Sequence, residues 1–143
     1  MRWIDLPPVW LLGGLVATWA SPWQVPWGPN ATFGSGLILI GIVVTLAAII
    51  EFGRSKTSII PRQDPNALIT SGIFRFSRNP IYLADVLILI GVTIYWGKWL
   101  GFLLVPLFVW LLHHRFIRGE EAKLQDAFGD SFKAYASRVR RWL

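Results

Sequence analysis

The sequence of 143 residues contains no cysteine and little charge. The absence of cysteine excludes disulfides, thiolate metal sites and cysteine nucleophiles. Asp, Glu, Lys and Arg make up 15% of the residues, whereas hydrophobic residues make up 54%. Because soluble domains carry about a quarter charged residues, the composition indicates a membrane protein that forms a single domain over residues 1–143.

The charges that are present are mostly basic, and the net charge is +6. A basic excess can indicate a nucleic-acid partner, but here the Lys and Arg residues gather in one loop and in the tail, as membrane topology requires. We therefore expect no nucleic-acid partner. The nine tryptophans also fit a bilayer protein, because indole rings concentrate at membrane interfaces.

Four apolar runs predict an all-α integral membrane fold. They cover residues 9–20, 34–50, 81–96 and 100–112. Each is shorter than the length of about 20 residues that a straight span needs, so we expect four short transmembrane helices. Only residues 97–99 separate the last two runs, which predicts a tight helical hairpin.

The first apolar run has an alternative interpretation as a signal peptide, because Arg2 precedes it and the small residue Ala20 ends it. Asp5 and the pair Pro7–Pro8 argue against that interpretation. We favour a retained helix that begins at the proline pair, since a missing N–H costs little in the first helical turn.

The distribution of charge predicts the orientation. Residues 52–80 contain five basic residues and one acidic residue, whereas residues 21–33 contain no charged residue. The positive-inside rule therefore places residues 52–80 and both termini in the cytosol. From residue 115 to residue 143, apolar residues recur at helical spacing, which predicts an amphipathic cytosolic helical region beside the membrane part (1–114). We expect Gly129 to break that region into two helices.

Polar residues meet where the predicted hairpin opens toward the cytosol. Because its two helices are antiparallel, the residues before position 82 face those after position 113. The residues expected there are Arg75, Arg78, Asn79, Tyr82, Arg118, Glu120 and Glu121. A helix that begins at Pro80 offers free N–H groups to a carboxylate or phosphate, and the glutamates could hold an ammonium group or ribose hydroxyls. Phe74, Tyr82 or Tyr135 could face a sulfonium.

Each group also has a simpler interpretation. The arginines could only fix the orientation and contact lipid phosphates. The glutamates could form a solvated helix face that pairs with Lys123. Their convergence on one place favours a binding site for a polar ligand of both signs.

Asp85 lies about one and a half turns into the third helix, where a carboxyl group is a candidate functional residue. Its alternative role is an internal ion pair with Arg78 or Arg118. We expect no metal site, because the adjacent residues His113 and His114 point about 100° apart on a helix, whereas ligands on one face need a spacing of three or four.

Three segments resemble the isoprenylcysteine carboxyl methyltransferase and phospholipid methyltransferase superfamily of integral membrane enzymes, in particular its small bacterial members. They are S-G-I-F-R-F-S-R-N-P-I-Y-L (71–83), R-G-E-E-A-K-L (118–124) and F-G-D-S-F-K-A-Y-A-S-R-V-R-R-W (128–142), and the loop T-S-I-I-P (57–61) is also similar. The resemblance covers residues 57–142. It implies a multi-pass protein of the bacterial plasma membrane, with a lipophilic methyl acceptor and an S-adenosylmethionine pocket at the cytosolic face that the C-terminal helices (115–143) complete.

The resemblance also implies roles for individual residues. The cofactor-binding residues would be Gly72, Arg78, Asn79, Pro80, Tyr82, Leu83, Glu120 and Glu121. The catalytic residues would be Arg118, which orients the acceptor or the cofactor carboxylate, and Glu121, as a base for an amine acceptor. The family pattern does not call for Asp85, but we expect Arg75 and Asp85 to contact the acceptor, and Asp85 is the alternative base for an amine.

Three positions depart from the family pattern. Asn79 stands where carboxyl-methylating relatives usually have His, Ala84 where Gly is common, and Phe132 where Tyr is frequent. These departures bear on the acceptor more than on the cofactor, so a carboxylate, a phospholipid amine and another lipophilic nucleophile all stay open.

Two other functions stay open beside direct methyl transfer. Membrane sterol reductases resemble the same C-terminal region and use NADPH, whose extra phosphate would suit the arginines, although those enzymes are usually much larger. A non-enzymatic protein that binds anionic lipids is the third hypothesis.

Overall fold

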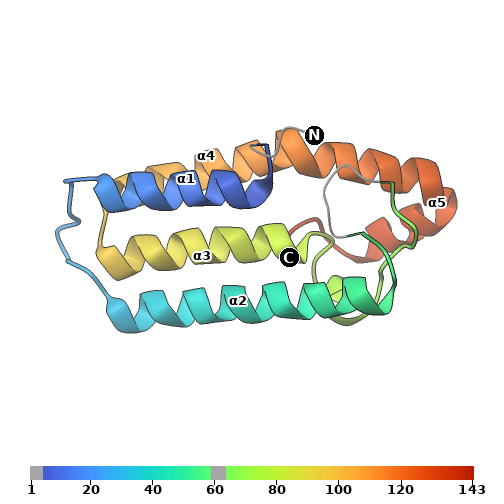
Figure 1. Cartoon of the computed structure of the whole chain (residues 1–143), viewed down its shortest axis with the longest axis horizontal. Helices are drawn as coiled ribbons and strands as arrows, with labels where there is room; N and C mark the ends of the chain where they lie inside the picture. Colours follow the sequence, from blue (N-terminus) through green and yellow to red (C-terminus); the bar gives the residue numbers. More distant parts are fainter. Residues whose placement is uncertain (1–4, 59–63) are drawn as a thin grey trace.

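The computed structural model describes residues 5–58 and 64–143, so Arg2, Arg62 and most of the loop 57–61 lie outside the described residues. Four helices lie side by side along the long axis, and a fifth folds over one end (Figure 1). The helices are α1 (Pro7–Ala20), α2 (Ala31–Arg54), α3 (Pro80–Trp96), α4 (Trp99–Leu112) and α5 (Arg118–Arg138), with a 3-10 helix η1 (Gly72–Arg75) and a π-helical turn η2 (His113–Ile117). Over the described ranges there is no strand, which confirms the all-α prediction.

The helix starts follow from local chemistry. Pro7 and Pro80 stand in the first turns of α1 and α3, as predicted, where their missing N–H groups cost no helical hydrogen bond. The prediction for α2 began three residues late, because Asn30 caps this helix through a 3.0 Å hydrogen bond from the Phe33 N–H to its side-chain oxygen.

α2 packs along α3 through small residues spaced seven apart. Gly34, Gly41 and Ala48 are buried on α2, and Ala84 and Gly91 are buried on α3. A Cβ atom added at Gly34 would lie 2.6 Å from the Gly91 carbonyl oxygen, and one added at Gly41 would lie 2.9 Å from the Ala84 carbonyl oxygen. Close backbone approach of this kind is typical of helices that associate in lipid.

α3 lies in the middle of the bundle, with α2 on one side and α1 and α4 on the other (Figure 1). Its face toward α4 contributes Tyr82, Val86 and Leu89 to the main hydrophobic cluster, where they meet Phe108 and Leu112. Because three helices pack on α3, even Asp85, its single acidic residue, is buried.

The outward faces of the helices are apolar. Leu12, Val16, Leu39, Val43 and Leu103 are each more than half exposed. By length and composition, α2 and the continuous helical stretch Trp99–Arg138 could each cross a membrane, and α1 and α3 are shorter apolar helices. These features are those of a membrane protein.

The predicted hairpin between α3 and α4 is confirmed. Gly97 ends α3 in the left-handed conformation, with φ of 62°, and α4 begins at Trp99. A Cβ at Gly97 would lie 2.7 Å from the Pro29 backbone nitrogen, so the turn also packs against the α1–α2 connection. Glycine satisfies both requirements at once.

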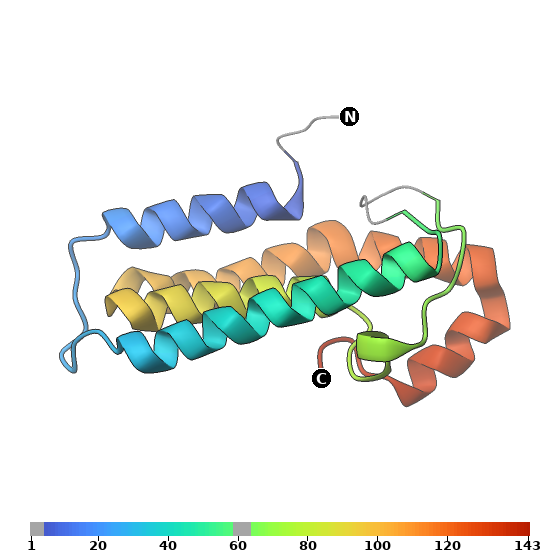
Figure 2. The same cartoon turned by 60° about the horizontal axis from the view of Figure 1, so that its bottom comes forward.

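α4 continues through η2 into α5. The break predicted at Gly129 is confirmed, because its φ of 49° and ψ of −118° are not helical. The second half of α5 then turns back toward η1, and the chain ends beside the start of α3 (Figure 2). This return buries Phe132 and Tyr135.

Candidate functional site

A pocket lies at the end of the bundle where α5 folds over. It contains about 600 Å³ of empty space, part of which is open solvent. Its walls come from the end of α2, the loop before η1, the start of α3, and α5. The lining residues are Phe52, Thr57, Ser58, Pro65, Ala67, Leu68, Ile69, Phe74, Arg78, Asn79, Glu120, Glu121, Leu124, Phe132 and Tyr135.

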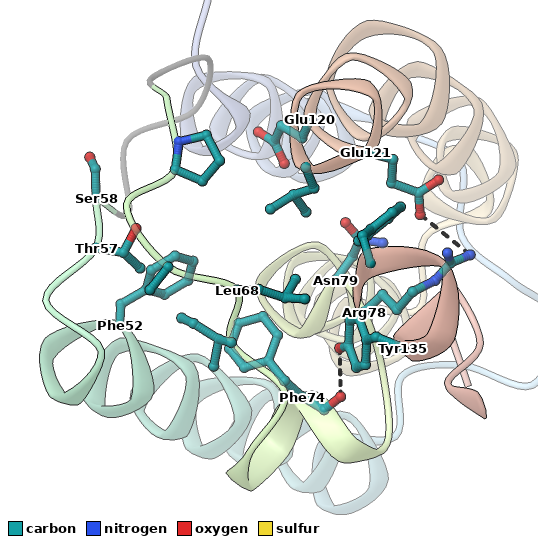
Figure 3. A pocket seen from close by; sticks show the side chains of 15 residues that line it. Phe52, Thr57, Ser58, Leu68, Phe74, Arg78, Asn79, Glu120, Glu121 and Tyr135 are labelled. Carbon is teal, nitrogen blue, oxygen red and sulfur yellow. Dashed lines mark hydrogen bonds and ion pairs between the residues drawn. The ribbon is translucent and has the colours of Figure 1, made fainter. Parts of the chain in front are cut away.

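The polar wall joins the start of α3 to the start of α5. Tyr82 donates a 2.6 Å hydrogen bond to Glu120 Oε1, and Arg78 Nη2 lies 3.4 Å from Glu121 Oε1. In Figure 3 the two glutamates lie on one side of the pocket, with Arg78 beside Glu121 and Phe74 opposite. The predicted approach of these segments across the hairpin is confirmed for these four polar residues.

Glu121 is shared by two guanidinium groups. Arg141 donates from Nε to both carboxylate oxygens at 3.1 Å and from Nη2 to Oε2 at 2.6 Å. This hydrogen bonding raises the pKa of Arg141. The side chains of Arg78 and Glu121 are only 14% and 13% exposed, and Arg78 Nε is buried without a hydrogen-bond partner.

This arrangement leaves the Arg78 guanidinium only partly paired. Two guanidinium groups surround one carboxylate, and a buried donor without an acceptor costs free energy until a ligand supplies one. The pocket is therefore suited to a ligand with an anionic group near Arg78.

The opposite wall is apolar and aromatic. Phe52 and Phe74 meet edge to face, with ring centroids 5.6 Å apart. The Tyr135 hydroxyl donates a 2.7 Å hydrogen bond to the Phe74 carbonyl oxygen, and burial raises the pKa of Tyr135 to about 12. The hydroxyl therefore stays protonated and ties η1 to the second half of α5.

Other residues predicted for the site lie outside the pocket lining. Pro80 is buried at the start of α3, and the Leu83 N–H donates to the Asn79 carbonyl oxygen. Gly72 has φ of 54° and lies against Glu51, where a Cβ would come within 2.6 Å of the carboxyl carbon. Arg75 and Arg118 are exposed. The sequence placed these residues near the opening of the hairpin, but it did not show which side of each helix faces the pocket.

Asp85 is buried, and its Oδ2 atom has no hydrogen-bond partner. No ion pair joins it to Arg78 or Arg118 within residues 5–58 and 64–143, so that alternative is wrong. At 100° per residue, Asp85 projects between Ile88, which faces Gly41 of α2, and Leu89, which faces Gly14 of α1. It therefore lies on the face of α3 between α1 and α2.

Residues 115–143 were expected to complete the cofactor pocket, but no individual residue after α5 was predicted for the site. The Arg78 N–H donates to the Arg140 carbonyl oxygen at 3.0 Å, and Asn79 Nδ2 donates to the Arg141 carbonyl oxygen at 3.1 Å. The tail arginines had been assigned only to topology. The signal that could have found them is Trp142, an apolar anchor directly after two arginines, which packs on the main hydrophobic cluster.

Among the described residues, no group of three or more His, Asp or Glu side chains could hold a metal ion.

Comparison with known proteins gives one family. Residues 29–131 match the family described as phospholipid methyltransferase. The chain is 29% identical over 110 residues to protein-S-isoprenylcysteine O-methyltransferase of Schizosaccharomyces pombe, which covers 76% of this chain and 47% of that protein. It is 29% identical over 111 residues to protein-S-isoprenylcysteine O-methyltransferase B of Arabidopsis thaliana, which covers 76% of this chain and 56% of that protein.

A probable protein-S-isoprenylcysteine O-methyltransferase of Oryza sativa subsp. indica is 30% identical over 112 residues, which cover 77% of this chain and 59% of that protein. The chain thus spans about half of the length of the curated relatives that it matches. No solved structure matches it.

Proposed function

The chain belongs to the phospholipid methyltransferase family, and on this premise we propose that it is an S-adenosylmethionine-dependent methyltransferase that acts on a lipophilic acceptor at a membrane surface. The observation that carries the proposal is the buried, unpartnered Arg78 Nε in a pocket that also contains two glutamates and an aromatic wall. S-adenosylmethionine combines a carboxylate, an ammonium group, ribose hydroxyls and a sulfonium, and each has a chemical counterpart there.

The residues of the pocket suggest how the cofactor is held. Arg78 and the N-terminal end of α3 would receive its carboxylate. Glu120 would accept hydrogen bonds from its ammonium group or ribose, and Tyr82 holds Glu120 for this task. The aromatic wall around Phe74 offers ring faces to a cation. Asn79, Pro80, Leu83 and Gly72 would shape the backbone that carries these groups.

The cofactor supplies an activated methyl group, so the protein needs chiefly to align the acceptor with it. We propose that the acceptor reaches the pocket along α3 between α1 and α2, where Asp85 can accept a hydrogen bond or a proton from it. Arg118 on the first turn of α5 and Arg75 on η1, both exposed, would attract its acidic groups. Glu121 stays a candidate for proton transfer.

For the membrane we propose four crossings, with the pocket and both ends of the described chain in the cytosol. The 17 residues of α3 give a length of about 25 Å at 1.5 Å per residue, which is close to the hydrocarbon thickness of about 30 Å. The basic residues near the pocket, among them Arg54, Lys56 and Arg75, lie on the side that this orientation makes cytosolic.

Isothermal titration of the detergent-purified protein with S-adenosylhomocysteine tests the proposal. We expect saturable binding that is lost in Arg78→Ala and unchanged in Arg138→Ala, whose guanidinium only contacts its own helix at Ala134. Absence of binding, or equal binding in all variants, would refute it. Displacement by NADPH would favour the reductase, and binding only to anionic vesicles, lost steadily with salt, would favour a lipid-binding protein.

A further inference from the structure

After α5 ends at Arg138, residues 139–143 run back to the start of α3 (Figure 2). We call residues 139–143 the return segment. It receives three hydrogen bonds from consecutive residues before α3. They come from Ser77 Oγ to the Arg141 carbonyl oxygen at 3.3 Å, from the Arg78 N–H to the Arg140 carbonyl oxygen at 3.0 Å, and from Asn79 Nδ2 to the Arg141 carbonyl oxygen at 3.1 Å. Trp142 anchors the segment on the main hydrophobic cluster.

The Arg141 side chain leaves this segment toward α5. Its guanidinium contacts both oxygens of Glu121, and the shortest of these contacts is 2.6 Å. Arg78 approaches the same carboxylate only to 3.4 Å. Arg141 therefore binds the Glu121 carboxylate in a bidentate geometry, whereas Arg78 contacts it only loosely.

This inequality matters for the pocket. Arg78 lines the pocket and retains a buried Nε without a partner. If Arg141 were absent, Glu121 would be free to pair fully with Arg78, because the two side chains are already in contact and both are shielded from water. The positive charge offered to a ligand would then be cancelled within the protein.

We infer that Arg141 is a positioning residue that occupies Glu121 and so keeps Arg78 available for an anionic ligand group. The inference rests on the proposed function, and it assigns the return segment to the binding site although its side chains do not line the pocket. It also explains why two arginines lie beside one buried carboxylate. Arg141 balances the charge of Glu121, and Arg78 binds the ligand.

A double-mutant cycle measured by titration with S-adenosylhomocysteine tests the inference. We expect Arg141→Ala to raise Kd about tenfold, which is near the lower limit for the loss of a hydrogen bond to a charged group, because the Arg141 side chain is 36% exposed. The matched control is Arg140→Ala, which removes an exposed guanidinium and leaves the backbone carbonyl in place. It should bind like the wild type. In a Glu121→Gln background, Arg141→Ala should change Kd less than about twofold, because no carboxylate remains to capture Arg78.

The outcomes separate the possible roles. An unchanged Kd in Arg141→Ala, or the same tenfold loss in both backgrounds, overturns the inference, because a merely structural anchor would act in both. If Arg141→Ala does not fold, Arg141→Lys serves in its place. Lysine keeps the positive charge but cannot make the bidentate contact with Glu121, so the Kd of this variant for S-adenosylhomocysteine should rise severalfold. An unchanged Kd overturns the inference. If the wild type binds no S-adenosylhomocysteine, the proposed function fails and the inference fails with it. If the wild type binds and the Arg141 variants bind equally well, only the inference is refuted.

Discussion

Replacement of Gly34 by alanine should loosen the packing of α2 on α3, whereas the same replacement at Gly36 should not. A Cβ at Gly34 would lie 2.6 Å from the Gly91 carbonyl oxygen and 2.6 Å from the Tyr95 backbone nitrogen, while one at Gly36 meets nothing within 4 Å. Ordinary contact begins at 3.4 Å, so the two backbones must separate by about 0.8 Å or more. Overpacking of this kind costs about 1 to 3 kcal/mol.

The pair of variants isolates that cost, because both gain the same helix propensity of about 1 kcal/mol. Thermal unfolding in detergent, followed by tryptophan fluorescence, should therefore give a lower Tm for Gly34→Ala than for Gly36→Ala. At roughly 3 °C per kcal/mol, the difference should be about 3 to 9 °C. Equal midpoints for the two variants would show that α2 does not approach α3 as closely as the structure has it.

Three further predictions concern the site. Tyr82→Phe should weaken S-adenosylhomocysteine binding about tenfold in titration, because Glu120 loses a hydrogen bond to a charged group; unchanged binding would contradict the role of Glu120. Asp85→Asn should lower methyl transfer to a lipophilic acceptor while leaving the cofactor Kd unchanged, since Asp85 lies outside the pocket lining; a changed cofactor Kd would place it in the cofactor site instead. Because the pKa of Tyr135 is raised to about 12, its contribution to stability is full below pH 10 and is lost as pH rises from 10 through 12. Unfolding titrations should show that the wild type loses more stability than Tyr135→Phe over that interval, and parallel curves would contradict the burial of this hydroxyl.

Local signals in the sequence predicted the helices well. Proline at positions 7 and 80 restricts the local backbone, and glycine at position 129 permits a backbone conformation that other residues avoid, so their effects needed no tertiary information. The start of α2 was misplaced because Asn30 follows a polar, proline-rich stretch that hides a cap in the sequence.

The candidate site could be predicted only in part. The antiparallel hairpin made the approach of Arg78 and Tyr82 to the glutamates foreseeable, since the spacing along two neighbouring helices fixes it. The path of the return segment was not predicted, because it depends on the angle at Gly129 and on where Trp142 docks. Such long-range placement leaves no periodic trace in the sequence.

The continuous passage of α4 through η2 into α5 gives the pocket walls unequal stiffness. The wall that carries Glu120 and Glu121 is a helix in line with α4, and α4 is locked to α3 at its far end, where Gly101 meets Thr93. The wall at residues 65–69 belongs to no helix or strand. Backbone that lacks the regular hydrogen bonds of a helix or strand opens at a lower free energy. A ligand that widens the pocket would therefore displace the loop, while Glu120 and Glu121 keep their positions.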